Sequence, residues 1–316
     1  MTRNALAIRT VTLLGALVFL AGMAEAASPP TSDRFLTDLE RMGRYFEAHP
    51  ELKTQRSTGW KPYNRAKWFS ASRMENGRTV GPEARWDAWE VKKERASRQL
   101  DRAAWFEIGP TNLSGRILAL AFHPTDPNTV YVGAASGGLW MTTDGGDTWT
   151  PKADGIPSIA IGGIGVSVND PNIVVIGTGE GTMNADAQSG VGILRSTDGG
   201  DTWHPTNVTY NVSSSSGFHF IEVNPLTGTM LAGERTGMWR SIDDGATWTK
   251  VRPSGEYFDA EWKTGTTRVY TIGGGSAWGG NTLQVSTDDG VTWTSSASGL
   301  PSPSSIGKAK LSVCRG

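Results

Sequence analysis

One eight-residue pattern recurs four times along the chain and limits what the chain can fold into more than any other feature. The copies are TTDGGDTW (142–149), STDGGDTW (196–203), SIDDGATW (241–248) and STDDGVTW (286–293). Their tryptophans are 54, 45 and 45 residues apart. Units of about 40–50 residues with four short strands each are typical of β-propeller blades. The spacing therefore predicts a repeated, all-β architecture.

Each repeat unit contains the same order of short apolar segments and turns. The first unit predicts strands within 115–124, 129–136, 137–142 and 148–153, and the other three units follow the same order. We therefore expect four-stranded antiparallel blades. The nearly continuous apolar runs 117–122 and 173–176 predict inner strands that neighbouring blades cover on both faces.

Every residue type in the repeated box has a structural use. Asp144 can accept hydrogen bonds from backbone N–H groups of its own loop. Gly145 and Gly146 permit positive φ angles. Trp149 can bury a large face between blades, with a gain of about 2–3 kcal/mol. We expect the same of the matching residues in the other boxes, which are Asp198, Trp203, Asp243, Trp248, Asp288 and Trp293.

Residues 1–26 have the features of a signal peptide. Arg3 and Arg9 precede the apolar run 11–22, and the small residues AEAA follow it, with cleavage expected after Ala26. The run is short for a membrane span, so we expect no stable membrane insertion after cleavage, with an uncleaved anchor as the alternative. The sequence thus predicts a secreted, periplasmic or cell-surface protein.

Residues 27–105 form a basic, helical and aromatic lead-in to the blades at 106–316. The lead-in has 16 basic against 11 acidic residues (net +5), and the blades have 12 against 19 (net −7). The acidic blades argue against nucleic acid as a partner. Residues 33–48 predict an amphipathic helix. The aromatic residues within 51–105 favour packing on the following domain, with a carbohydrate or nucleic-acid platform as the alternative.

Four boxes, followed by a tail without a fifth, predict a propeller with an open edge. Unpaired edges promote aggregation. We therefore expect a truncated chain, or a chain completed by another polypeptide.

The four boxes fit the pattern S/T-x-D-x-G-x-T-W and resemble the Asp-box, or sialidase-type, repeat of sialidases, xyloglucanases and the sortilin ectodomain. The resemblance covers roughly residues 105–300, and 106–149 looks most like large secreted bacterial proteins of the sortilin-like type. It implies that the box joins the third and fourth strands of a blade, on the face opposite the ligand-binding mouth. Catalysis is therefore not implied for the box aspartates.

The mouth implied by this resemblance is built from the loops 133–138, 177–192, 233–237 and 273–281. Charged residues in or beside these loops are the candidate ligand-binding residues, namely Arg116, Glu180, Asp186, Glu234 and Arg235. We expect no catalytic residue, no metal site and no cofactor. The four histidines, His49, His123, His204 and His219, are scattered without metal-ligand spacing and are expected to be structural.

Two enzyme patterns of the family are incomplete in this chain. A xyloglucanase has a catalytic aspartate in a stretch similar to Y-x-R-T-D-x-G-G, and the matching YVGAASGG (131–138) has Ala135 at that position. Arg116 is placed as a first-blade sialidase arginine would be, but Gly115 and Leu118 depart from that pattern. We therefore expect non-catalytic binding of an extracellular polypeptide or glycan at the mouth. The alternative is a glycoside hydrolase with catalytic groups partly on missing blades.

Overall fold

The computed structural model describes residues 31–55, 58–71, 74–75, 78–81, 83–98, 115–182, 187–211, 216–296 and 298–313. The chain forms two compact units, Met1–Arg78 and Thr79–Gly316. The expected boundary at residue 105 falls outside the described residues and stays a prediction. The expected signal peptide also lies outside them.

The first unit is helical. It contains α2 (Thr31–Ala48), the 3₁₀ helix η1 (Pro50–Lys53) and α3 (Trp60–Ala71), followed by the short strand β1 (Met74–Glu75). The helix expected at 33–48 is confirmed by α2. Phe46 is buried, and its ring packs 5.1 Å from Trp60 and 5.3 Å from Tyr63. These aromatic residues thus form a small core within this unit.

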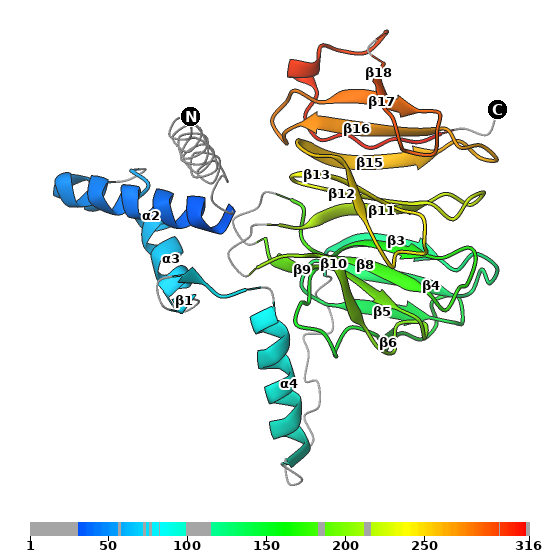
Figure 1. Ribbon diagram of the computed structural model, residues 1–316, viewed down its shortest axis with the longest axis horizontal. Coiled ribbons are helices and arrows are strands. Elements are labelled where there is room, and N and C mark those ends of the chain that lie inside the picture. Colours follow the sequence, from blue (N-terminus) through cyan, green and yellow to red (C-terminus); the bar gives the residue numbers. More distant parts are fainter. Residues whose placement is uncertain are drawn as a thin grey trace, which may run out of the picture. The chain divides into compact units, whose positions relative to one another are not determined.

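The second unit contains four antiparallel four-stranded sheets, which confirms the predicted blades (Figure 1). The strands of each sheet are paired in chain order. Blade 1 has β3 (Ile117–Phe122), β4 (Val130–Ala134), β5 (Leu139–Thr142) and β6 (Thr150–Pro151); blade 2 has β7 (Ile161–Val166), β8 (Val174–Gly179), β9 (Ser189–Ser196) and β10 (His204–Thr209). Blade 3 has β11 (Phe218–Val223), β12 (Met230–Glu234), β13 (Gly237–Ser241) and β14 (Thr249–Arg252); blade 4 has β15 (Glu256–Trp262), β16 (Val269–Gly275), β17 (Thr282–Ser286) and β18 (Thr294–Ser295).

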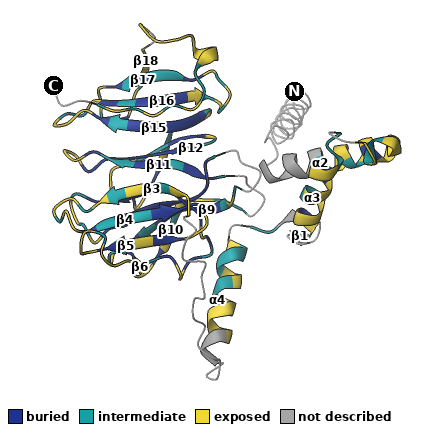
Figure 2. Cartoon of the chain, turned by 180° about the vertical axis from the view of Figure 1, so that it is seen from behind, coloured by how far each residue is buried: buried dark blue, intermediate teal, exposed yellow. Residues whose placement is uncertain are grey.

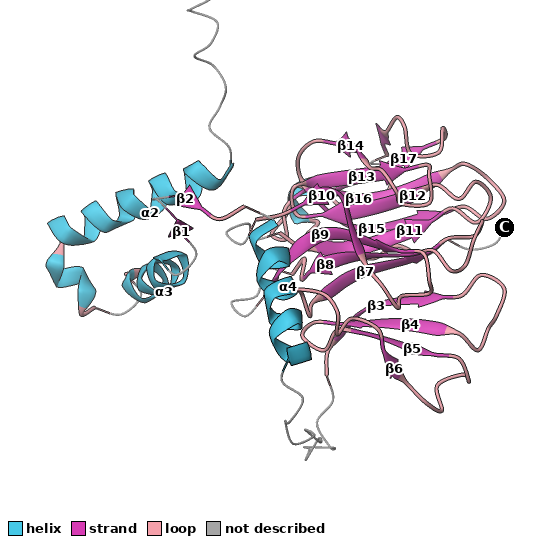
Figure 3. Cartoon of the chain, turned by 60° about the horizontal axis from the view of Figure 1, so that its bottom comes forward, coloured by secondary structure: helices cyan, strands magenta, loops and turns pink. Residues whose placement is uncertain are grey.

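Helices are few in this unit. The strand β2 (Arg78–Thr79) lies at the boundary between the two units, and the helix α4 (Glu83–Arg98) follows it in the chain (Figure 3). The 3₁₀ helix η2 (Pro303–Ser305) comes after the last blade. Trp86 of α4 packs against the core between blades 1 and 2, as expected for the aromatic lead-in. None of the described helices is both long and apolar enough to cross a membrane.

Inner strands are buried in blade 2 but not in blade 1. Every residue of β7 and β8 is buried, as predicted. The prediction is wrong for β3, where Leu120 is 54% and Phe122 63% exposed (Figure 2). Ile164 of blade 2 occupies the strand position that Leu120 occupies in blade 1. Ile164 is only 4% exposed, because blade 1 covers it. No described blade lies on the corresponding face of β3.

The box aspartates bind their own loops, as expected. Asp198 accepts hydrogen bonds from the backbone N–H of Thr202 (2.9 Å), from the Thr202 hydroxyl (2.6 Å) and from the Ser196 hydroxyl (2.7 Å). These bonds, led by the one from the Thr202 side chain, lower the pKa of Asp198 to about 2. The other three boxes have the same arrangement. The box therefore forms a hydrogen-bonded turn that stabilises the connection between the third and fourth strands of each blade.

The box tryptophans differ in burial. Trp203 and Trp248 are 8% and 3% exposed, as predicted for side chains between blades. Trp149 is 41% exposed, so the prediction is wrong there. Only in the second box does the indole N–H reach the preceding blade, at the carbonyl of Lys152 (2.8 Å); the other three donate to a glycine carbonyl of their own box.

The inner strands of blades 3 and 4 bring three carboxylates together. Burial raises the pKa of Glu222 to about 8, and the negative charges of Glu261 and Asp259 act in the same direction. The positive charge of Lys310 lowers the pKa of Glu222 and so opposes this shift. The Lys310 ammonium nitrogen lies 2.9 Å from a carboxylate oxygen of Asp259. Glu222 is thus a carboxyl group that favours its protonated form in the folded protein.

Replacing Ser196 by alanine should lower the free energy of unfolding by about 1–3 kcal/mol, because the buried N–H of Gly200 loses the hydroxyl that accepts it at 2.8 Å. Chemical denaturation measures the change. Thr197→Ala is the matched control, since Thr197 is the exposed neighbour in the same box. Equal loss of stability in both variants would contradict the fastening role of Ser196.

Glu222→Gln should change how stability depends on pH. Its carboxyl group ionises near 4.5 in the unfolded chain and near 8 in the fold, so it lowers the stability of the wild type as pH rises through that interval. The variant should therefore gain stability over the wild type at pH 8 but not at pH 4. Urea denaturation at both values tests this, with Asp147→Asn as an exposed-site control. Parallel pH profiles would contradict it.

Candidate functional site

The mouth lies at the edge of the blades opposite the boxes. At one edge the backbone N–H of Ala135 donates to the carbonyl of Arg116 (3.0 Å), which joins the end of β4 to the start of β3. At the other edge the N–H of box residue Gly145 donates to the carbonyl of Asn128 (3.0 Å). The four box aspartates are therefore remote from the mouth, as the Asp-box resemblance implies.

A cavity of about 370 Å³ lies against the first strands of the blades at the mouth edge. Ile117 and Leu118 come from β3, Gly162 from β7, and Phe258 from β15. Further lining residues come from β11 and from two connecting segments: Phe218, His219, Gly181, Thr182, Lys308, Ala309 and Lys310. The cavity is mainly apolar, with polar groups that converge at its edge, as in most small-molecule sites.

Two of the predicted ligand-binding residues meet beside this cavity. The Arg116 guanidinium lies 2.7 Å from a carboxylate oxygen of Glu180, and the Thr182 hydroxyl donates to the same oxygen. The Glu180 side chain is 1% exposed and the Arg116 side chain 44%. Glu180 follows β8 directly, and its N–H donates to the Gln188 carbonyl (2.8 Å). Blades 1 and 2 thus share a charged pair at the mouth.

A second glutamate, Glu256, lies behind His219, which lines the cavity. His219 was expected to be a structural residue. His219 Nε2 lies 2.9 Å from a carboxylate oxygen of Glu256, and both side chains are nearly buried. The His219 ring also packs 5.0 Å from Phe258. No sequence signal pairs these two residues, which are 37 positions apart and come from different blades.

Glu234 is buried in a network rather than presented to a ligand. One carboxylate oxygen accepts from the Thr236 hydroxyl (2.9 Å), the Trp239 indole (2.9 Å) and Lys250 (3.0 Å). The other accepts from the phenol of Tyr210. Burial and the Glu234 charge raise the pKa of Tyr210. This network ties the end of blade 2 to three strands of blade 3.

The remaining predicted residues do not join the site. Arg235 lies in the two-residue turn after β12 and is partly buried. Asp186 lies outside the described residues. Ala135 is buried at the mouth and offers no group for proton transfer. Among the described residues, no three or more His, Cys, Asp and Glu side chains are placed to hold a metal ion.

Comparison with known proteins adds a family context. Residues 194–205 match the BNR/Asp-box repeat family. The chain is 30% identical over 218 residues to xyloglucanase Xgh74A of Acetivibrio thermocellus. The aligned segment covers 57% of this chain and 25% of that protein. It is 28% identical over 220 residues to a xyloglucanase of Paenibacillus sp, covering 57% and 21%. The chain thus spans a quarter or less of the length of these curated relatives.

Solved structures with related architecture include xyloglucanases. That of the GH74 enzyme of Xanthomonas campestris is 22% identical, with a TM-score of 0.45 and coverage of 60% of this chain and 31% of that one. An ancestral GH74 enzyme is 18% identical, with a TM-score of 0.48 and coverage of 61% and 27%. The chain thus carries four boxes of the BNR/Asp-box type on four β-propeller blades, and its sequence is similar to those of xyloglucanases.

Proposed function

We propose that this protein is a glycoside hydrolase that binds a glycan at the mouth of its blades. The sequence similarity to xyloglucanases supports this alternative better than the non-catalytic binding predicted first. We further propose that residues 1–26 direct the protein out of the cytoplasm, where a polysaccharide substrate is accessible. A polypeptide ligand is a weaker proposal, because no relative reported above is named for one.

The observation that carries the proposal is the position of Glu180. Ala135 replaces the aspartate of the xyloglucanase pattern, but its backbone is bonded to Arg116, and Arg116 holds Glu180. A carboxylate from blade 2 is therefore present at the part of the mouth where blade 1 lacks one. Glu256 is the second carboxylate near this part of the mouth, where it is bonded to His219, a residue that lines the cavity.

Glycoside hydrolysis needs two carboxyl groups, one of which donates a proton to the leaving oxygen. Glu180, ion-paired with Arg116, is assigned as the carboxylate that acts as base or nucleophile. Glu256 is hydrogen-bonded to an imidazole and is assigned as the group that exchanges the proton. Phe218 and Phe258, both buried, form apolar walls of the cavity beside these groups.

Release of new reducing ends from xyloglucan by the purified protein tests the proposal. Glu180→Gln and Glu256→Gln should each lower kcat by about 10²–10⁴, the usual share of acid–base catalysis, while circular dichroism confirms folding. Asp147→Asn, on the exposed first box, should keep the wild-type rate.

Two outcomes would contradict the proposal. Wild-type protein that binds xyloglucan without cleaving it would restore the non-catalytic binding prediction. Hydrolysis that survives both glutamine substitutions would remove Glu180 and Glu256 from the reaction.

A further inference from the structure

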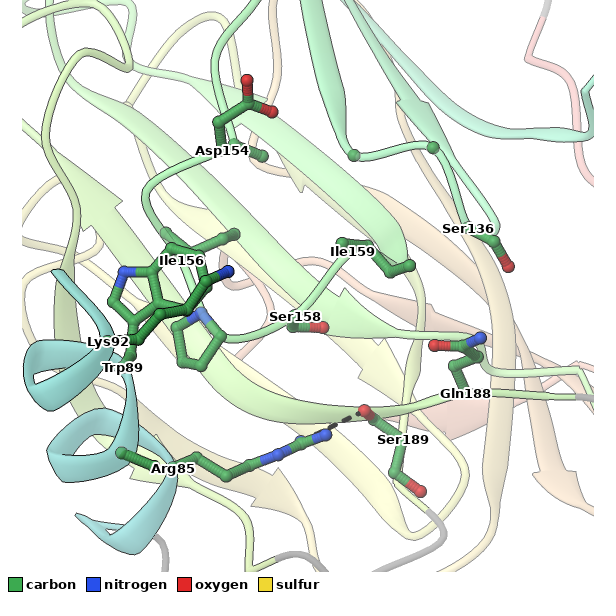
Figure 4. A pocket seen from close by; sticks show the side chains of 15 residues that line it. Arg85, Trp89, Lys92, Ser136, Asp154, Ile156, Ser158, Ile159, Gln188 and Ser189 are labelled. Carbon is green, nitrogen blue, oxygen red and sulfur yellow. Dashed lines mark hydrogen bonds between the residues drawn. The ribbon is translucent and has the colours of Figure 1, made fainter. Parts of the chain in front are cut away.

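A second cavity lies away from the first strands, between helix α4 and the loops of blades 1 and 2. Its volume is about 700 Å³, within the range of about 300–1,000 Å³ typical of small-molecule sites. Figure 4 shows α4 on one side, Asp154 on a second, and Ser136 and Gln188 on the side facing the helix. The mouth loop 133–138 contributes part of its wall.

The helix presents one face to this cavity and is anchored beside it. Arg85, Trp89 and Lys92 follow helical spacing, so they share a face. The Arg85 guanidinium donates to the carbonyls of Ser189 (3.4 Å) and Gly190 (3.2 Å) at the start of β9 (Figure 4). Trp86, on a neighbouring face, packs against the core of the blades. The helix is thereby fixed with Trp89 towards the cavity.

Trp89 has an unused hydrogen-bond donor. Its indole Nε1 is buried and has no hydrogen-bond partner among the described residues. A buried donor left unpaired is costly, and a bound water or ion is one way in which folded proteins satisfy such a group. The Lys92 ammonium lies 4.1 Å from the centre of the same ring. Aromatic surface, an N–H donor and a cation are thus combined at one wall.

The other walls suit a ring that is apolar on its faces and hydroxylated at its edge. Ile156, Pro157 and Ile159 supply apolar surface, and Ile159 is 48% exposed. Hydroxyl and amide groups surround this surface, from Ser136, Ser158, Gln188 and Ser189. Sugar rings have this combination of apolar faces and polar edges, and tryptophan is an effective stacking surface for such faces.

The charged residues that line the cavity are two cations and one anion: Arg85, Lys92 and Asp154. The exposed Lys92 ammonium on this wall favours a negatively charged ligand. We propose that α4 and blades 1 and 2 form a second glycan site, which binds an acidic oligosaccharide through Trp89 and Lys92. The proposal does not depend on hydrolysis, because neither Glu180 nor Glu256 lines this cavity.

Isothermal titration of the exported protein with trigalacturonate, and with neutral cellotriose as reference, tests the site. Trigalacturonate should bind at least about tenfold more tightly, a difference of about one ion pair within a partly enclosed site. Trp89→Ala should abolish the tight binding of trigalacturonate, and Lys92→Gln should remove its advantage over cellotriose. Lys93→Gln is the matched control, because Lys93 pairs with Glu90 and does not line the cavity.

The result separates this site from the proposed catalytic cavity. Glu180→Gln should leave trigalacturonate binding unchanged, and Trp89→Ala should leave cleavage of a short substrate unchanged. Equal affinity for both sugars would overturn the assignment of an acidic ligand. Tight trigalacturonate binding that survives Trp89→Ala, or binding of an acidic peptide in place of trigalacturonate, would overturn the glycan site itself.

Discussion

The close packing of each blade on the next is the constraint on which the rest of the structure depends. A Cβ atom at Gly162 would lie 2.1 Å from the Phe218 carbonyl oxygen, and one at Gly163 would lie 2.6 Å from the backbone of Phe220. Strands β7 and β11 can therefore approach this closely only because both positions are glycine. At the outer part of the same interface, the Arg195 guanidinium donates to the carbonyl of Asp244 (2.8 Å), and Arg240 repeats this contact with Asp289 one blade later (2.7 Å). The mouth inherits its geometry from this stacking, because Glu180 and Glu256 each find their partner on another blade.

The parts of the fold that sequence could predict are those whose bonds are local. The box aspartates bind residues two to four positions away, so the motif itself contains the whole fastening, and the order of four strands follows from turn residues and apolar runs. The mouth pairs could not be predicted, because Arg116 and Glu180 are 64 positions apart and meet only when blades stack. Burial of an inner strand also depends on a neighbour. Leu120 and Ile164 look alike in sequence, yet one is exposed and the other buried.

Carboxylates saturated with protein donors occur at both edges of the blades. At the box edge, Asp198 and Asp288 are saturated with donors of their own loop, which lower their pKa to about 2 and leave them no role in proton transfer at neutral pH. Glu234 is equally saturated, although its loop belongs to the mouth. Charge and position in a loop were therefore insufficient to identify a functional carboxylate.

The replacement of an aspartate by Ala135 changes the geometry that any catalysis here requires. A carboxylate at residue 135 would extend from the end of β4, whereas Glu180 extends from the end of β8, one blade further round the mouth. Arg116 connects the two positions, since its backbone binds Ala135 and its side chain binds Glu180. A glycan cleaved by Glu180 must therefore lie closer to blade 2 than a substrate of the xyloglucanase pattern. Gln188 connects this part of the mouth to the second cavity, since its carbonyl accepts the N–H of Glu180 and it also lines the cavity beside α4.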